Sequence, residues 1–381
     1  MRALLIVSIL SVVFGLSRVS LACGSLVFRE EHGAMADQQV LIAQGKERTV
    51  LMVSVGYANV DDEFAFLLPL QHEPLEVVEG EPKLFKSLDE MTAPWIQVVD
   101  ATSTPATSRG CCGAPVDAGS GGHAEDQVFV AQHGETTSYE YVVLGGSSGS
   151  TVSAWLQERG FAAPSALSAD IDDYLSKKWL FLAAKLKPST ARGALAPLEI
   201  HYARIPVAEL EYPFRFSRHS LKPSSRVAID LYLAGDAMLP ANYAVRRVNR
   251  GELRALSPRT TNYEALADGA LAGKAFLLQS GSAEESAARV FGQAWLDTPH
   301  REPPALTRTY EKLLPERIAL VRLHAELSGS DLDDLHLMRA TPEQIVFDRT
   351  LRVRWGSPTS TASMVGLLFG LVALRRRSRA R

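Results

Sequence analysis

The chain has 381 residues, of which 46% are hydrophobic and 22% are charged, and its formal net charge at pH 7 is −3. This composition is that of a globular protein and excludes a largely disordered or fibrous chain. Residues 23–355 alone carry a formal charge of −10, because seven arginines lie in the two terminal segments. A body with this net charge is not expected to bind nucleic acid or anionic lipid without specificity.

The N-terminus predicts a secretory signal peptide over residues 1–22. Arg2 precedes an apolar run that ends at Leu16, and Ser20-Leu21-Ala22 fits a small-x-small cleavage site. The run is shorter than the about 20 apolar residues that a membrane span needs. Cleavage would make Cys23 the first mature residue. Lipidation of Cys23 stays open as an alternative, although Ser20 stands where lipoprotein signals usually carry Leu or Val.

Residues 23–146 are predicted to form a β-rich sub-domain. Apolar and polar side chains alternate in residues 47–59, and FAFLLPL at 64–70 reads as a further strand, so residues 38–70 predict a meander sheet. A short helix is expected at 81–93, and strands are expected at 95–100, 126–132 and 138–145. Residues 101–125 are rich in Gly, Ser, Pro and Ala and predict a long surface loop.

Residues 147–350 are predicted to form a second sub-domain of mixed α and β structure, with its boundary near Gly146–Gly149. A helix capped by Ser150 is expected first, followed by a second helix at 165–177. Further strands are predicted at 179–187, 198–203, 213–221, 226–234, 274–279 and 317–327, with a helix at 262–272. Successive strands without crossover helices imply antiparallel pairing. The predicted fold class is therefore α+β, mainly antiparallel sheets with a few short helices.

Residues 356–381 predict a hydrophobic C-terminal anchor or sorting tail. The apolar run from Ala362 to Leu374 would span about 20 Å as a helix, short of a ~30 Å hydrocarbon core. The arginine cluster at 375–381 would hold this end in the cytoplasm. The expected location is the periplasm or cell surface of a bacterium, with membrane association through this tail unless it is cleaved.

Cys23, Cys111 and Cys112 are the candidates for a disulfide. Neighbouring Cα atoms lie about 3.8 Å apart, below the ~4.4–6.8 Å typical of disulfides, which disfavours a Cys111–Cys112 bond. In an exported protein we expect Cys23 to pair with either one. An alternative is a zinc or copper site made by Cys111-Cys112 with His123 and His133, but this spacing matches no closed ligand pattern. No metal or other cofactor is predicted.

The segment Gly145-Gly146-Ser147-Ser148-Gly149 fits the pattern G-x-S-x-G between a predicted strand and a predicted helix. This context is typical of a nucleophile elbow, with Ser147 as nucleophile, Asp230 or Asp236 as acid and His300 or His324 as base. A Gly/Ser-rich link is the simpler interpretation, because such a segment matches by composition alone and the surrounding strands are expected to be antiparallel. No HGGG-like oxyanion segment lies upstream.

Acidic runs and tryptophans receive structural interpretations. Asp61-Asp62-Glu63 and residues 331–334 could hold calcium, but the second run lacks the glycine and closing glutamate of a calcium loop. Both runs are expected to be solvated turns. Trp95, Trp155, Trp179 and Trp295 lie in apolar periodic segments and are predicted to be core or interface residues.

The order of many short segments resembles the bacterial family known as domain of unknown function 2330. These segments are Cys23-Gly24, FAFLLPL, Thr92-Ala93-Pro94, Cys111-Cys112, Trp155-Leu156 with Gly160-Phe161 and Pro164, KKWLFLAAKLKP, PFRFS, LPANY and NYEAL. The resemblance covers about residues 23–348 and implies an exported protein, often with a C-terminal anchor or sorting tail. It supplies no catalytic residues and implies that the link around Ser147 varies in the family.

The preferred interpretation is an exported, non-enzymatic cell-envelope protein that binds a partner or contributes to surface structure. Its partners would be an unknown cell-envelope component and the membrane, reached through the C-terminal tail, and no nucleic acid. The alternative is a periplasmic serine hydrolase that uses Ser147.

Overall fold

A computed structural model describes residues 25–28, 34–58, 64–100, 129–159, 165–187, 196–221, 224–292, 310 and 312–355. The predicted signal peptide, the three cysteines, the loop at 101–125 and the tail at 356–381 lie outside these residues. Within the described part of the chain, no helix is both long enough and apolar enough to cross a membrane.

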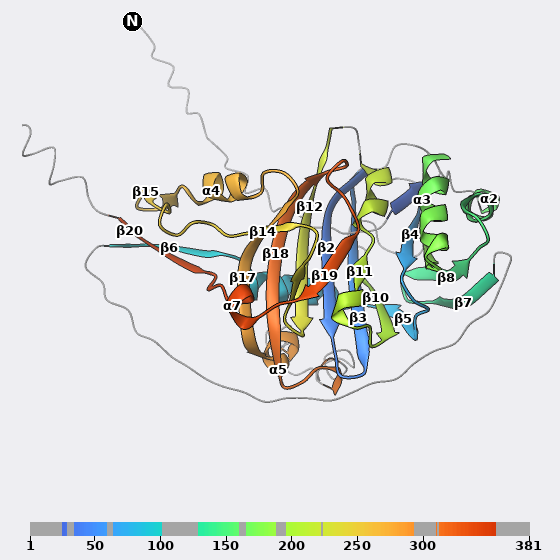
Figure 1. Ribbon diagram of the computed structural model, residues 1–381, viewed down its shortest axis with the longest axis horizontal. Helices are drawn as coiled ribbons and strands as arrows, with labels where there is room; N and C mark the ends of the chain where they lie inside the picture. Colours follow the sequence, from blue (N-terminus) through green and yellow to red (C-terminus); the bar gives the residue numbers. More distant parts are fainter. Residues whose placement is uncertain are drawn as a thin grey trace, which may run out of the picture.

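The centre of the fold is an eight-stranded sheet with the order β14-β17-β18-β12-β2-β3-β10-β5 (Figure 1). The bounds in chain order are β2 Ala34–Gln44, β3 Arg48–Ala58, β5 Glu76–Glu79, β10 Leu198–Ala203, β12 Arg226–Gly235, β14 Ala244–Arg246, β17 Ala275–Ser286 and β18 Arg317–Ser328. Strand β12 pairs antiparallel with β18 and parallel with β2. Strand β14 pairs parallel with β17.

The alternation of side chains along β12 explains its central place in this sheet. Ile229, Leu231 and Leu233 face the main core, whereas Tyr232 and Ala234 face a second core on the opposite side, and all five are fully buried. A strand covered on both faces needs apolar side chains in both registers.

A second, five-stranded sheet has the order β1-β4-β9-β8-β7 and is antiparallel throughout. Its strands are β1 Ser25–Phe28, β4 Phe64–Leu70, β7 Phe129–Glu135, β8 Tyr139–Gly145 and β9 Leu180–Leu186. Helices α2 (Gly149–Glu158) and α3 (Ser165–Ser176) lie on its outer side in Figure 1. Val152 and Ile171 pack there against Leu144 and Phe181 of the sheet.

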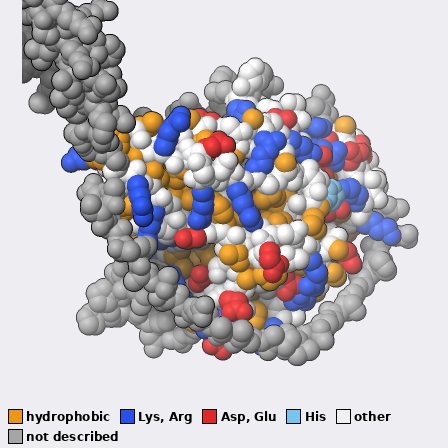
Figure 2. Space-filling model, turned by 60° about the vertical axis from the view of Figure 1, so that its left-hand side comes forward, with side chains coloured by type: hydrophobic (Ala, Val, Ile, Leu, Met, Phe, Trp, Pro, Cys, Tyr) orange, Lys and Arg blue, Asp and Glu red, His pale blue; other side chains and the backbone are white. Residues whose placement is uncertain are grey.

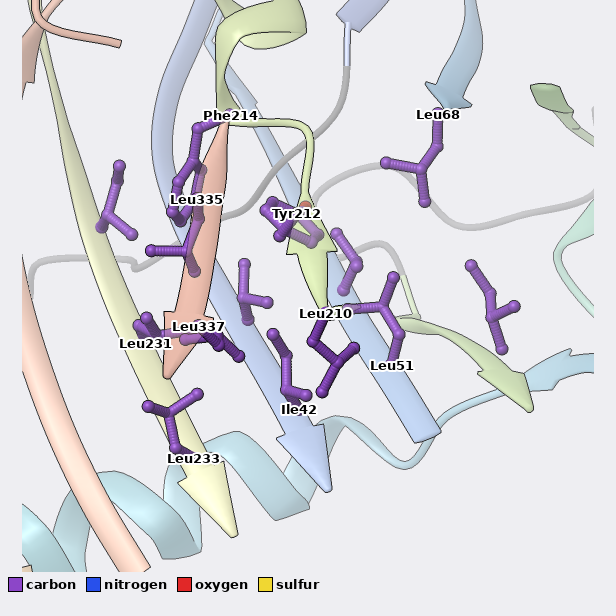
Figure 3. Close-up of a cluster of buried hydrophobic side chains, with 14 of the residues drawn as sticks. Ile42, Leu51, Leu68, Leu210, Tyr212, Phe214, Leu231, Leu233, Leu335 and Leu337 are labelled. Atoms are coloured by element: carbon purple, nitrogen blue, oxygen red, sulfur yellow. The ribbon is translucent and has the colours of Figure 1, made fainter. Parts of the chain in front are cut away.

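The main hydrophobic core joins the two large sheets. Ile42, Leu51 and Leu231 of the eight-stranded sheet share one buried cluster with Phe66 and Leu182 of the five-stranded sheet. A smaller sheet, β11-β19-β13 (Glu211–Tyr212, Leu335–Arg339, Met238–Pro240), covers part of this cluster. Figure 3 shows its leucines and aromatic rings over the central strands. Two 3-10 helices, η1 (Val207–Glu209) and η2 (Phe214–Ser220), flank β11.

The opposite face of the central sheet is covered by α1 (Pro82–Thr92), α5 (Ala287–Gly292) and Tyr310. Leu84, Phe85 and Leu88 of α1 share one apolar stripe and are buried there, as helical spacing predicts. The cover is therefore formed by chain segments from both halves of the sequence.

One end of the molecule is built from short elements, at the left of Figure 1. They are β6 (Trp95–Asp100), β15 (Ala255–Ser257), β16 (Thr260–Thr261), α4 (Tyr263–Ala270), α7 (Pro342–Ile345) and β20 (Thr350–Trp355). Strands β6 and β20 form a two-stranded parallel sheet. Gly281 of β17 exchanges two backbone hydrogen bonds with Phe347, at 2.9 and 2.8 Å. A Cβ at this glycine would lie 1.8 Å from the Ile345 carbonyl oxygen, so a side chain there would clash.

The structure confirms the α+β class with mainly antiparallel sheets. It also confirms the predicted helices at 81–93, 165–177 and 262–272 and the strand interpretation of 317–327.

Three local predictions were wrong. Residues 38–70 are not a meander, because β4 leaves the β2–β3 hairpin and joins the five-stranded sheet. Residues 213–221 form η2 rather than a strand. The predicted strands at 179–187, 198–203 and 226–234 do not pair with one another, whereas those at 274–279 and 317–327 pair antiparallel. The predicted sub-domain boundary near residue 146 stays a prediction, although both large sheets combine strands from either side of it.

Candidate functional site

The predicted serine lies in a strand–turn–helix next to the five-stranded sheet, whereas Asp230 and His324 belong to the eight-stranded sheet. Ser147 is exposed in the link between β8 and α2, just after the end of β8. The N-cap of α2 is Ser148, not the predicted Ser150, and the Ser148 hydroxyl accepts the Thr151 backbone N–H at 3.2 Å. In contrast, Asp230 and His324 lie on the central sheet, on β12 and β18.

The other predicted triad members take different places. Asp236 accepts from the Arg204 guanidinium at 2.8 Å and lies 3.4 Å from Arg339, so it serves an ion-pair network. His300 lies outside the described residues, as do Cys111, Cys112 and His123 of the alternative metal site. His133 lies in β7, and no group of three metal-ligating side chains is found in the described ranges.

Asp230 and His324 meet in a buried charged cluster together with Arg322. His324 Nδ1 lies 2.9 Å from Asp230 Oδ1, and Arg322 Nη2 lies 3.2 Å from the same oxygen. Arg322 also donates from Nη1 to Asp89 Oδ1 of α1 at 2.5 Å. The side chains of Arg322 and Asp230 are only 7% and 14% exposed. The cluster therefore ties α1 to the central sheet.

Opposing effects set the protonation of Asp230. Burial alone would raise its pKa, but the hydrogen bond from His324 and the positive charge of Arg322 outweigh burial. The pKa of Asp230 consequently lies below its ordinary value of 3.8. The carboxylate is thus charged at neutral pH and balances Arg322 in a region with little water.

A second cluster fastens α3 to the segment 211–220 and to β19. Asp170 of α3 accepts from Arg218 at 2.7 Å and lies 2.6 Å from His219 Nε2. Burial would raise the pKa of Asp170, but the His219 hydrogen bond and the Arg218 charge lower it. Tyr174 donates to Asp334 at 2.5 Å. Burial raises the pKa of Asp334 despite that hydrogen bond.

A third histidine–carboxylate pair lies inside the second core. His201 Nε2 lies 2.6 Å from Glu199 Oε1, and the Tyr310 hydroxyl donates to Glu199 Oε2 at 3.2 Å. The side chains of His201 and Glu199 are almost completely buried. Burial, together with the charge of Glu199, raises the pKa of Tyr310 well above 10.

These three clusters share one chemical character. Each joins a histidine to a carboxylate and links elements that are distant in sequence. His201, His219 and His324 lie within hydrogen-bond distance of Glu199, Asp170 and Asp230, respectively. The arrangement can order and fasten the fold, and these histidine contacts run to carboxylates rather than to the hydroxyl that a serine hydrolase activates.

The sequence contains a signal for one of these clusters that the triad hypothesis misses. Arg322 and His324 stand two positions apart on β18, so they must lie on the same face of the sheet. Asp230 belongs to the strand that pairs with β18, directly opposite His324. Arg215, Arg218 and His219 carry no comparable signal, because the sequence pattern of their segment predicts a strand.

Comparisons with known proteins identify a family and no activity. Residues 18–276 match the sequence profile of a family described as an uncharacterized protein conserved in bacteria, DUF2330. A search of curated proteins gives no match.

Solved structures of baculovirus P35 are also matched. One is 11% identical and has a TM-score of 0.33, over 81% of this chain and 98% of that chain. A caspase-8/P35 complex is 9% identical with a TM-score of 0.32, over 79% and 96%. Likeness at this level establishes neither a shared fold nor a shared function.

Proposed function

The chain belongs to the uncharacterized bacterial family DUF2330, and we propose that it is an exported, non-enzymatic cell-envelope protein held at the membrane by its C-terminal segment. Its body would act as a binding or structural module outside the cytoplasm. Three features support this proposal. Residues 1–22 resemble a signal peptide, and residues 356–381 combine an apolar run with a cluster of arginines. The buried charges of the body form ion pairs within the fold.

The observation that carries the proposal is the position of the last described strand. β20 ends at Trp355 on a two-stranded sheet at one end of the molecule, away from the two large sheets (Figure 1). The apolar run 362–374 starts only a few residues later in the sequence. A tail that leaves the fold at its periphery can enter a bilayer without pulling a strand out of the core.

The test is expression of the full chain in a Gram-negative bacterium, followed by fractionation and mass spectrometry. We expect a mature form that begins at Cys23, resists carbonate extraction from the membrane and is digested by protease added to spheroplasts. Recovery of a chain that begins at Met1 in the cytoplasm would contradict export.

Two variants of one residue test the anchor. Leu368→Arg places a charge inside the apolar run, which costs about 3 kcal/mol at the centre of a membrane helix, so the protein should be released from the membrane. Leu368→Ala shortens the same side chain without adding a charge and should remain in the membrane fraction. Equal distribution of the two variants would show that residues 362–374 do not anchor the chain.

A further inference from the structure

The end of the molecule that carries β20 presents a group of exposed arginines. Arg247, Arg250, Arg254, Arg259, Arg352 and Arg354 are all exposed and are called here the arginine surface. Residues 244–261 and 346–355 contain only two acidic residues, Glu252 and Asp348. Figure 2 turns this side of the molecule forward and shows Lys and Arg side chains spread over it, with hydrophobic side chains between them. The acidic net charge of the body therefore conceals a basic face.

Contacts between the two segments hold these arginines at one site. The guanidinium groups of Arg247 and Arg250 lie 5.8 and 4.6 Å from the centre of the Phe347 ring. Strand β15 contacts β20. Arg352 donates from Nε to Gln97 of the neighbouring strand β6 at 3.2 Å. The surface is thus made by residues of β20 and of the neighbouring segment 247–259, which these contacts hold together.

Three of these arginines retain charge that the described structure does not neutralise. For the side chains of Arg254, Arg259 and Arg354, no ion pair or hydrogen bond is found within the described ranges. The positive charge of the surface is therefore available to an anionic partner.

Exposed apolar side chains accompany the arginines. Trp95, expected from its apolar surroundings in sequence to be a core or interface residue, is 54% exposed at the start of β6, where its backbone N–H donates to the Arg349 carbonyl. Leu256 of β15 and Val346 are 58% and 52% exposed. A surface that combines arginine with tryptophan and aliphatic side chains matches the mixed polar and apolar chemistry of a lipid headgroup region.

The covalent connection limits how far this surface can lie from a membrane. Only residues 356–361 separate Trp355 from the apolar run that begins at Ala362. Six extended residues span at most about 20 Å. If residues 362–374 enter a bilayer, the end of β20 must therefore lie within about 20 Å of its surface. Headgroup attraction extends over a Debye length of roughly 8–10 Å, so the arginine surface feels it when this side of the body turns toward the bilayer.

We propose that the arginine surface rests on anionic lipid headgroups beside the point where the C-terminal segment enters the membrane. This inference rests on the proposed membrane attachment and adds to it an orientation of the body and a lipid class. Phosphate oxygens of the headgroups would accept from Arg254, Arg259 and Arg354, and Trp95 and Leu256 would contact the boundary between headgroups and acyl chains.

The test compares the full chain in nanodiscs of phosphatidylcholine alone and of phosphatidylcholine with 30% phosphatidylglycerol, by hydrogen exchange. We expect peptides from residues 249–261 and 350–355 to exchange at least about fivefold more slowly on the anionic discs. The protection should decrease at high salt, because headgroup attraction is screened. Exchange in α2 and α3 should be the same on both discs.

Matched variants assign the effect to the surface. The combined change Arg254→Gln, Arg259→Gln and Arg354→Gln should abolish the protection on anionic discs. The control variant combines Lys46→Gln, Arg159→Gln and Lys178→Gln, which removes three exposed cations in the β2–β3 turn, after α2 and after α3. This variant should retain the protection on anionic discs. Equal exchange on both discs, or equal effects of the two variants, would overturn the inference.

Two further outcomes distinguish a lipid surface from an acidic protein partner and from failure of the anchor. Equal protection by soluble polyglutamate would identify an acidic protein as the preferred partner and overturn the lipid assignment. If the chain does not insert into neutral discs, the proposed anchor fails. Flotation with anionic vesicles then tests whether the arginine surface binds lipid. The native chain should bind the vesicles, and the triple Arg→Gln variant should not.

Discussion

At the scale of single residues, the buried charged groups described above connect elements of the fold. Asp230, Arg322 and His324 carry the residue types of a catalytic site, yet their hydrogen bonds point to one another and to α1. A buried ion pair contributes little compared with apolar residues of the same volume, but removal of one partner leaves a charge without compensation. These residues are therefore sensitive positions for stability.

Asp230→Asn is expected to lower the free energy of unfolding at pH 7 by about 3 kcal/mol. The pKa of Asp230 is depressed in the folded state, so its contribution is present above about pH 4 and is lost as the pH falls through the folded pKa. The difference between native protein and variant should therefore shrink below pH 3.8. Urea denaturation at several pH values measures this difference.

Asp268→Asn serves as the control for Asp230, because Asp268 is exposed on α4. Its effect should stay within about 0.5 kcal/mol at every pH. A pH-independent loss in Asp230→Asn would show that the lost charge is not the cause.

At the scale of elements, the serine-rich link between β8 and α2 contains neighbouring serines with different structural roles, which the sequence alone does not distinguish. Ser148 has an extended backbone and caps α2, whereas Ser147 is exposed beside it. Ser148→Ala should lower stability by about 1 kcal/mol through loss of the cap, and Ser147→Ala should have almost no effect. Thermal unfolding of both variants measures this. A larger loss for Ser147→Ala would require a role that its exposure does not explain.

Local sequence patterns predict the elements of this fold well and their partners poorly. The alternation in β3 and β12 reflects burial on the faces of a sheet, which leaves a direct pattern in the sequence. Phe214 and Phe216 also alternate, but Pro213 precedes them and the segment turns into a 3-10 helix, with both rings buried in different cores. A period of two in so short a segment does not distinguish these structures.

The candidate site shows the same limit. The sequence pattern identifies Asp230 and His324, although as alternatives for a hydrolase, and it does not identify Arg322. Arg322 and Asp230 are 92 positions apart, and only the pairing of β12 with β18 brings them together. Register between distant strands depends on the whole fold, so a local pattern cannot supply it.

At the scale of the whole molecule, the two large sheets depend on each other. β9 lies between β4 and β8 in the five-stranded sheet, and β10 and β12 flank the β2–β3 hairpin in the other. A fragment of residues 23–146 would therefore leave unpaired edges on β4 and β8 of one sheet and on β2 and β3 of the other. We expect this fragment to lack native tertiary structure in near-UV circular dichroism and in NMR spectra.

The full body, by contrast, should unfold in one cooperative transition when it is followed by tryptophan fluorescence and far-UV circular dichroism. Two separate transitions, or a folded fragment of residues 23–146, would instead support independent sub-domains on either side of residue 146.

The parallel pairing of β6 with β20 has a consequence for the order of folding. Gln97 and Arg352, which meet across this pair, are 255 positions apart. The first of these strands emerges from any ribosome or translocation channel long before its partner does. Contacts of such high sequence separation form slowly because a long loop must close first. The end of the body that carries the arginine surface can therefore assemble only after residue 355 has emerged, when the apolar C-terminal run is next to leave the channel.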